Sequence, residues 1–140
     1  MHPTARALLR PAAIGTAIAA VGVAAVHLIA TALGDPLTVN PGGAPQAVPL
    51  GAAVLFTVLG GVAGYVIALL ARRAGRPRTV FLAVTLVALA LYAIAPFGAA
   101  ENTSTALWLN LMHLVAAAAI LPLLARALPA ARVPAVGRAG

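Results

Sequence analysis

The chain contains no cysteine and no lysine among its 140 residues, and charged residues make up only 8% of it. The absence of cysteine excludes disulfides, iron–sulfur clusters and thiol catalysis. So few charges cannot cover a surface that faces water, and 63% of the residues are apolar, whereas a soluble domain is about half apolar. Together with a mean hydropathy of +1.06, this composition indicates an integral membrane protein.

The charges that are present lie at alternate ends of four long apolar stretches. Both acids, Asp35 and Glu101, lie in the connections that follow the first and third stretches. The arginines lie before the first stretch, between the second and third, and after the fourth: Arg6, Arg10, Arg72, Arg73, Arg76, Arg78, Arg126, Arg132 and Arg138. Because arginine-rich short loops stay in the cytoplasm during insertion, this pattern predicts four spans with both termini inside.

The net charge of +7 does not indicate a nucleic-acid binder, because the arginines flank apolar spans and do not accompany stacking aromatic residues on a polar face. We expect their partners to be the lipid bilayer and the anionic headgroups of its inner leaflet, at roughly 1 kcal/mol per basic residue. The use of arginine in place of lysine, with abundant alanine, is typical of a GC-rich bacterial genome. The sequence therefore favours a bacterial plasma membrane.

The apolar stretches have the length of transmembrane helices, which need about 20 residues to cross ~30 Å of hydrocarbon. They lack the strict alternation that barrel strands require. The connections are short, so neighbouring helices are expected to run antiparallel. We predict an all-α fold, a transmembrane up-down four-helix bundle over residues 1–128, followed by a disordered cytoplasmic tail at residues 129–140. The expected spans are 11–33, 49–71, 79–97 and 105–124.

The connections and helix ends carry further local signals. Residues 34–49 are rich in proline and glycine, which predicts an irregular outer loop. Thr103 or Ser104 is the expected cap of the fourth helix. The first span also shares features with a signal peptide, with arginines before it and an Ala-x-Ala site ending at Ala32. Its apolar run is longer than the roughly 7–15 residues of a cleavable segment, which favours a retained helix.

Small residues mark the faces on which the helices are expected to meet, because lipid is as apolar as leucine and helices associate through close backbone approach. The second span has the clearest stripe at helical spacing: Thr57, Gly60, Gly61, Gly64 and Ala68. The Gly60-x-x-x-Gly64 pair leaves two uses open, packing within the bundle or a homo-oligomer through small-residue helix faces. We favour packing within the bundle in a chain so rich in glycine and alanine.

The strongly polar side chains inside the spans are His27 in the first and Asn110 and His113 in the fourth. Such groups are costly in hydrocarbon and are candidates for function. The two histidines lie at matching depths, ~10–12 Å below the outer surface at a rise of 1.5 Å per residue, and Thr31 shares the helix face of His27. If the first and fourth helices are adjacent, these side chains form a polar intramembrane cluster below the two acids.

This cluster has three interpretations. Two histidines on facing helices can ligate a b-type haem or, with a carboxylate, a metal ion. They can also begin a proton relay that leads to Glu101, since histidine titrates near neutrality. In the structural interpretation, each neutral imidazole hydrogen-bonds Asn110, Thr31 or a backbone carbonyl and fixes the register of the helices. We favour the structural role and expect no cofactor or metal site, because no loop supplies further ligands at a recognisable spacing.

The sequence contains no Ser/His/Asp set, phosphate loop or pair of catalytic carboxylates, so we expect no enzymatic activity. Asp35 and Glu101 are expected to be solvated residues at the outer interface. No acid lies within a span, which argues against a small multidrug-resistance exchanger, because those depend on a membrane-embedded glutamate. We predict a structural or interaction role in the membrane. The alternative is a small transporter or proton-linked channel that uses His27 and His113.

The fourth span contains the sequence Leu107-Trp-Leu-Asn-Leu-Met-His-Leu-Val-Ala-Ala, in which residues 110–117 are the most distinctive. With its four spans and its Pro/Gly-rich first outer loop, the chain resembles small actinobacterial four-helix membrane proteins of a domain-of-unknown-function family. The resemblance covers most of the length. It implies the same fold and membrane location, and it supplies no activity, cofactor or catalytic residue.

Overall fold

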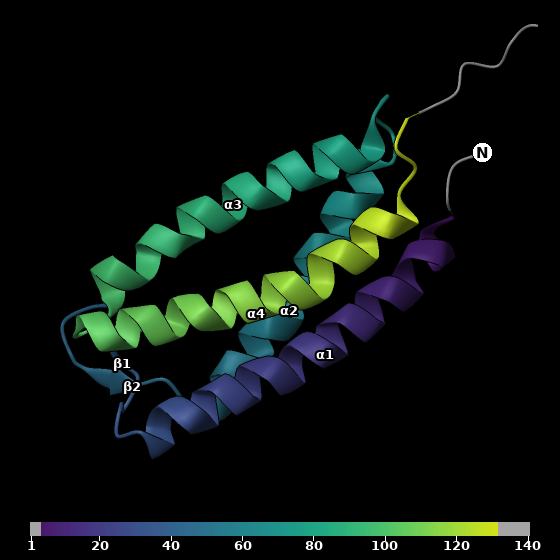
Figure 1. Cartoon of the computed structure of the whole chain (residues 1–140). Helices are drawn as coiled ribbons and strands as arrows, with labels where there is room; N and C mark the ends of the chain where they lie inside the picture. Colours follow the sequence, from purple (N-terminus) through teal and green to yellow (C-terminus); the bar gives the residue numbers. More distant parts are fainter. Residues whose placement is uncertain (1–3, 132–140) are drawn as a thin grey trace, which may run out of the picture.

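The computed structural model describes residues 4–131, which form four long helices and two short strands. The helices run alongside one another in up-down order, and both strands lie at one end of the bundle (Figure 1). The elements are α1 (Ala5–Ala32), β1 (Thr38–Val39), β2 (Gln46–Ala47), α2 (Leu50–Ala71), α3 (Pro77–Ala99) and α4 (Thr103–Ala127). The predicted fold class, an α-helical four-helix bundle, is confirmed.

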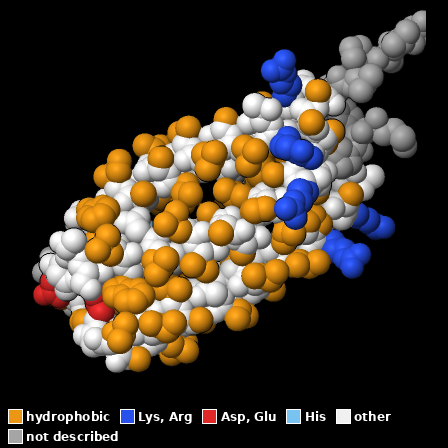
Figure 2. Space-filling model, in the orientation of Figure 1, with side chains coloured by type: hydrophobic (Ala, Val, Ile, Leu, Met, Phe, Trp, Pro, Cys, Tyr) orange, Lys and Arg blue, Asp and Glu red, His pale blue; other side chains and the backbone are white. Residues whose placement is uncertain are grey.

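The outside of the bundle is apolar along its length. Each helix is long and apolar enough to cross a membrane, with a mean hydropathy between 2.0 and 2.4 in its most apolar window. Val21, Phe56 and Ile94 are 74%, 69% and 68% exposed, and Figure 2 shows hydrophobic side chains between the charged ends. A soluble protein keeps contiguous apolar surface small. The chain is therefore a multi-pass membrane protein, and this surface is the one that contacts lipid.

Helix α1 begins earlier than its hydropathy predicts and ends in a glycine motif. The Thr4 hydroxyl accepts a hydrogen bond from the Ala7 N–H at 3.3 Å, which caps the helix ahead of the expected start at residue 11. At the other end Gly34 has a φ of 91°. The N–H groups of Gly34 and Asp35 donate to the last carbonyls of the helix at 3.1 and 3.0 Å, in a Schellman arrangement. This turn directs Asp35 back toward the bundle.

Helices α3 and α4 also extend beyond their expected limits. Pro77 occupies the first turn of α3, where its missing N–H costs nothing. Asn102 caps α4, because its side chain accepts from the Thr105 N–H at 2.8 Å, so neither Thr103 nor Ser104 is the cap that the sequence suggested. The tail predicted at residues 129–140 lies mostly outside the described residues.

Helix α1 packs most extensively against α4 and then against α2, and small residues allow this close approach. A Cβ on Gly15 would lie 3.1 Å from Ala119 O, and one on Gly61 would lie 2.9 Å from the Cβ of Thr16. Helix α3 packs less closely against both of its neighbours, α4 and α2, and its contact with α2 is the smaller of the two. The bundle is therefore tight on its α1 side and loose on its α3 side, as the separation of the α3 ribbon in Figure 1 also shows.

The buried apolar side chains form two clusters, one toward each end. The cluster near the arginine-rich end contains the larger side chains, with Leu8, Phe81 and Leu124 each fully buried. The cluster near the strands is smaller and includes Val23 and Met112. Burial of one such large side chain stabilises the fold by about 1.5–3 kcal/mol where the reference state exposes it to water. The arginine-rich end therefore has the better filled core.

The loop over residues 34–49, predicted to be an irregular outer loop, contains one short paired segment. Thr38 and Val39 pair with Ala47 and Gln46 in an antiparallel hairpin, and Val39 also forms a bridge with Ala100 in the second outer connection. The rest of the loop, where proline and glycine form the turns, is irregular as predicted. The hairpin joins these two connections into one cap over the end of the bundle, called the outer cap after the side of the membrane predicted for it.

Candidate functional site

His27 lies on the buried face of α1 with Ala19, Val23 and Ala30, and it is 7% exposed. Its Nε2 atom donates to the backbone carbonyl of Val48 at 2.8 Å, just before α2 begins. A carbonyl only accepts, so in the neutral ring Nε2 carries the proton and the buried, unpartnered Nδ1 is the bare nitrogen. His27 therefore fastens the end of the outer loop to α1, as a structural role requires.

Two other members of the predicted cluster form hydrogen bonds within their own helices. The exposed Thr31 donates from its hydroxyl to the carbonyls of His27 and Leu28, each at 3.1 Å. The Asn110 amide donates to the Ala106 carbonyl, also at 3.1 Å. Bonds to the preceding turn satisfy polar groups that would be costly in hydrocarbon. Neither side chain is hydrogen-bonded to a histidine ring within the described chain.

His113 faces α3 and not α1. Its ring lies 6.3 Å from that of Tyr92 between centroids, at an angle of 41°. Its Nδ1 atom is buried without a hydrogen bond of good geometry, although the Leu109 carbonyl one turn earlier lies near the ring. Helices α1 and α4 are adjacent, as expected, but over residues 4–131 no hydrogen bond or ring contact joins His113 to His27. The described chain therefore shows no direct contact between the two histidines of the predicted cluster.

A groove of about 430 Å³ runs along the bundle between α2, α3 and α4, and His113 and Tyr92 contribute to its wall. Thr57 and Thr85 also line it, but each hydroxyl donates at 2.8 Å to a backbone carbonyl one turn earlier. The rest of the lining is apolar. The side chains of His113 and Tyr92 are thus the polar groups of this lining that remain available to hydrogen-bond a ligand. Tyr92 was not among the candidate residues predicted from the sequence, because nothing in the sequence shows which helix it faces.

The groove opens toward lipid between α2 and α3. Phe56 and Tyr92, on opposite sides of this opening, are 69% and 64% exposed. A second hollow of about 520 Å³ lies between α3 and α4 nearer the arginine-rich end, and the two hollows share Leu89, Ala117 and Leu121. Figure 2 shows the surface hollowed between these helices. Helix α3 therefore stands away from both of its neighbours along its middle.

Asp35 is buried under the outer cap and is 9% exposed, which contradicts the solvated position expected for it. Its Oδ1 atom accepts from the Leu37 N–H at 2.8 Å and from the Thr105 hydroxyl at 2.6 Å. Burial raises the pKa of Asp35, but hydrogen bonds from Thr105, Ser104 and Leu37 together lower that pKa below its ordinary value. The carboxylate also lies at the first turn of α4, where the helix dipole favours a negative charge.

Asp35 therefore joins the end of α1 to the start of α4, across 70 positions of sequence. The same turn holds Leu37 at a φ of 50°, a left-handed conformation that is costly for leucine, with its side chain fully buried. Glu101 differs, because its side chain is exposed while its N–H donates to the Thr38 carbonyl at 3.0 Å. Of the two acids, only Glu101 has the exposed position that the sequence suggested.

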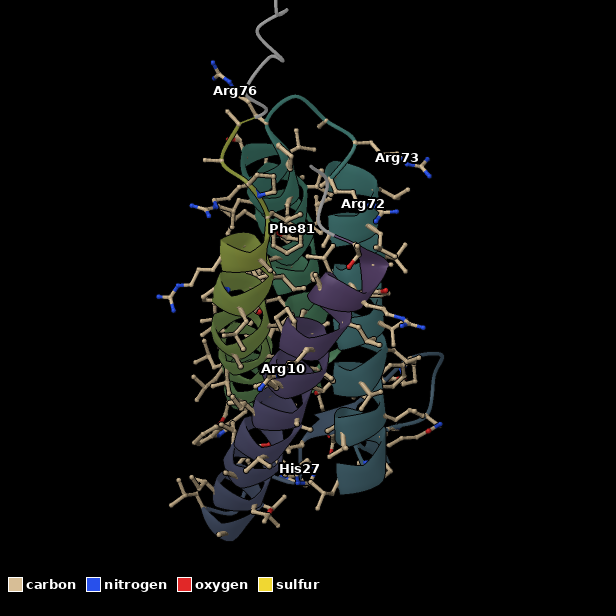
Figure 3. The ribbon with its side chains drawn as sticks, turned by 90° about the vertical axis from the view of Figure 1, so that its right-hand side faces the viewer. Arg10, His27, Arg72, Arg73, Arg76 and Phe81 are labelled. Carbon is tan, nitrogen blue, oxygen red and sulfur yellow. The ribbon has the colours of Figure 1, made fainter. Side chains whose placement is uncertain are left out.

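The described arginines lie toward one end of the bundle and the acids at the other (Figure 2). In Figure 3, Arg72, Arg73 and Arg76 lie together at one end and His27 lies toward the opposite end. The distribution agrees with the charge pattern of the sequence. It gives the two ends of the molecule opposite charge.

Arg78 has a structural role that sequence analysis missed. Its Nε and Nη2 atoms donate to the carbonyls of Ala125 and Leu128 at 2.8 and 3.1 Å, at the end of α4. An arginine in this place supplies donors to carbonyls at the helix end, of which Ala125 also accepts from the Leu128 N–H at 3.3 Å, and its charge suits the negative end of the helix dipole. The sequence offered a partial signal, since Arg78 directly follows the proline that starts α3. It was considered only as a marker of topology.

The site residues named from the sequence are thus distributed over different parts of the fold. His27 and Asp35 fasten the outer cap, Thr31 and Asn110 bond to their own helices, His113 faces the groove, and Glu101 is exposed. Within the described residues, no group of three or more His, Asp or Glu side chains is placed to hold a metal ion. Chemically, the arrangement offers one apolar groove with an imidazole and a phenol on its wall.

Comparison with known proteins identifies one family. The profile of a group described as Family of unknown function (DUF6069) matches residues 3–130, which is nearly the whole chain. No curated protein matches the chain. No solved structure matches it either.

Proposed function

We propose that this chain, which belongs to the family of unknown function DUF6069, is a non-enzymatic component of a bacterial plasma membrane with a structural or interaction role. The observation that carries the proposal is the separation of its intramembrane polar groups. His27 satisfies a loop carbonyl, while Thr31 and Asn110 satisfy carbonyls of their own helices. A relay needs polar groups in hydrogen-bond reach of each other or of shared water, and the geometry supports an interaction surface better than a relay.

The proposal includes an orientation, with both termini and the α2–α3 turn in the cytoplasm. It is supported by the collection of arginines at one end of the bundle and both acids at the other. In that orientation the arginines lie at the inner leaflet, where anionic headgroups attract them. The outer cap then faces the other side of the membrane.

Because the chain has no cysteine, single cysteines can test the orientation. Gly42, Thr103 and Gly75 are exposed, and a Cβ at Gly42 or Gly75 would meet no atom within 4 Å. Cysteines at Gly42 and Thr103 should react with an impermeant maleimide in intact cells, while one at Gly75 should react only after permeabilisation. The opposite pattern would show that the orientation is inverted.

A flux assay separates the proposed role from the alternative of a small transporter or proton-linked channel. Proteoliposomes that hold a pH-sensitive dye and the full chain should collapse an imposed proton gradient no faster than empty liposomes. The gradient should be equally stable with His27→Gln and His113→Gln variants. A proton flux that requires the protein and is lost on replacing either histidine would establish the transporter function instead.

A further inference from the structure

We infer that the groove between α2, α3 and α4 binds one chain of an uncharged lipid whose hydroxyl head hydrogen-bonds His113. This inference deepens the proposed interaction role and rests on it, because it names the chemical class of one partner. The groove volume of about 430 Å³ lies within the range of roughly 300–1,000 Å³ that small-ligand sites occupy. Its shape, its polar groups and their depth each limit what the ligand can be.

The shape of the groove favours a single chain. Its α2 wall runs from Ala53 to Ile67, a distance of ~20 Å at a rise of 1.5 Å per residue. A helix of that length with a diameter of about 10 Å would need on the order of 1,600 Å³. The whole empty space between the groove walls, about 1360 Å³ including its open side, is smaller than this, so the groove does not enclose a helix from a second copy or from another protein. One extended hydrocarbon chain has the required length and narrowness.

The polar groups favour a hydroxyl head. His113 and Tyr92 lie at the outer part of the groove, while the inner part of the wall, around Ile67 and Leu121, is apolar. The Nδ1 atom of His113 is buried and lies near the Leu109 carbonyl, which leaves Nε2 as the ring nitrogen that a ligand in the groove can reach. A neutral imidazole offers one donor and one acceptor, and a phenol offers both. A hydroxyl is the smallest head group that can donate and accept in the same place.

The depth of these groups excludes a charged headgroup. His113 is ten residues from the start of α4 at Thr103, and Tyr92 is seven from the end of α3 at Ala99, which corresponds to ~15 and ~10 Å along the helices. A charged group at such a depth in hydrocarbon is costly. The headgroup of an ordinary phospholipid would remain at the surface. A long-chain or prenyl alcohol can place its head at this depth.

The test uses the full chain in phosphatidylcholine nanodiscs and hexadecanol that carries a diazirine just past the middle of its chain, because Leu121 is ~12 Å from His113 along α4. Photolysis should label residues at the inner part of the groove, including Ile67 or Leu121, as located by mass spectrometry. Excess hexadecanol should compete with the probe, and hexadecane should compete about five-fold less well, the ratio expected for one hydrogen bond of about 1 kcal/mol. Equal competition by hexadecane would overturn the role of the head group.

Two pairs of variants test the site itself. A Cβ on Gly60, which lines the groove, would meet no atom within 4 Å, so Gly60→Leu fills the groove without a clash at its first atom. It should reduce labelling about ten-fold, while Gly51→Leu, at an equally open position of α2 outside the groove, should not. His113→Leu should abolish the preference for hexadecanol over hexadecane, and His113→Gln should retain it within about two-fold, as expected when one hydrogen-bonding group replaces another.

Labelling that is unchanged in Gly60→Leu would contradict the site. Labelling that falls as the number of protein copies per nanodisc rises would show that a second copy covers the groove, and it would also overturn the proposal. Thermal unfolding of each variant in the same nanodiscs confirms that the fold is intact. Failure of these experiments leaves the orientation and flux results unaffected, so the loss of the ligand proposal is distinguishable from the loss of the proposed membrane role.

Discussion

The two sides of the bundle are built from the same kinds of residue and differ in how closely the helices approach. On the α1 side, a Cβ on Gly15 would lie 3.1 Å from the backbone of α4, and one on Gly61 would clash with the Thr16 side chain of α1. On the α3 side, Gly60 faces open space and α3 stands away from α2 and α4. The difference shows that a small residue allows close packing only when the opposite helix supplies a complementary surface.

The two histidines illustrate the same contrast. His27 lies on the tightly packed α1 side and donates a hydrogen bond to Val48. His113 lies on the loosely packed α3 side, and its buried Nδ1 has no hydrogen-bond partner of good geometry. Both residues were expected to share one role because they lie at one depth. Their rotation about the helix axis, which the neighbouring helices determine, gives them different surroundings.

Adjacent glycines of α2 provide the most direct test of the contrast between the two sides. Gly61→Ala would place a Cβ 2.9 Å from the Cβ of Thr16, so we expect the free energy of unfolding to fall by about 2–3 kcal/mol, as for an overpacked core. Gly60→Ala meets no atom within 4 Å and should raise it by up to about 1 kcal/mol through helix propensity. Unfolding in mixed micelles measures both. Equal effects of the two changes would show that the α1–α2 contact is not tight.

The outer cap should depend on the charge of Asp35. Asp35→Asn weakens the bonds from Thr105 and Leu37, and we expect a loss of about 1–2 kcal/mol, the value of a hydrogen bond to a charged group. Because the folded-state pKa of Asp35 is depressed, its contribution is present above the unfolded-state pKa of about 3.9 and is lost as the pH falls through the lower folded-state pKa.

Acid unfolding of the wild type and of Asp35→Asn measures this dependence. The wild type should lose stability below about pH 4 through this group, and the variant should lack that component. Thr105→Val provides the matched change on the other side of the hydrogen bond. If Asp35→Asn and Thr105→Val have additive effects in the double variant, the bond between them does not stabilise the cap.

The same substitution at each of the two histidines compares the tightly packed α1 side with the loosely packed α3 side directly. His27→Leu removes the donor to Val48 and should lower the free energy of unfolding by about 1 kcal/mol or somewhat more, because it leaves a buried carbonyl without its partner. His113→Leu removes a buried nitrogen that has no partner, so stability should stay the same or increase. Thermal unfolding in one detergent provides the comparison. A larger loss for His113→Leu would reverse the assignment of roles.

Arg78 should contribute the smallest of these effects. Arg78→Gln weakens the cap on the end of α4 and should cost about 0.5–1 kcal/mol, the net value of an ordinary hydrogen bond at a partly exposed site. Arg76→Gln, at an exposed neighbouring position, is the matched control for the loss of one positive charge. Equal losses for the two variants would indicate that net charge, and not the cap, is responsible.

Much of the fold could be predicted from hydropathy and charge alone. Lipid requires that each backbone group be satisfied within its own segment, so four apolar stretches of sufficient length had to be four helices. The buried stripe of α2 was also predictable, since Thr57, Gly61, Gly64 and Ala68 are all buried. The exception was Gly60, which faces the groove, because helical spacing places it beside the stripe without showing whether a neighbouring helix covers it.

The candidate site was harder to predict because it depends on contacts between distant segments. The Asp35 contact with Thr105 requires the end of α1 to meet the start of α4, and no local pattern shows that meeting. The local part of this arrangement could be predicted, since an aspartate that accepts a hydrogen bond from the N–H two residues later forms a common turn. The depth of His113 could be counted from the sequence, whereas its orientation toward Tyr92 depends on how α4 rotates against α3.

The attachment of α3 has a mechanical consequence. At its start, Arg78 bonds to Ala125 and Leu128, and at its end the Ala99 carbonyl accepts from Asn40 at 2.7 Å. A helix attached at both ends can bend in its middle, but neither end can move away from the bundle. The space beside α3 is therefore a lateral opening toward the membrane interior, and the loops that carry β1 and β2 lie across one end of the bundle (Figure 1). The quantity that governs its occupancy is the mole fraction of a solute in the bilayer, and not its aqueous concentration.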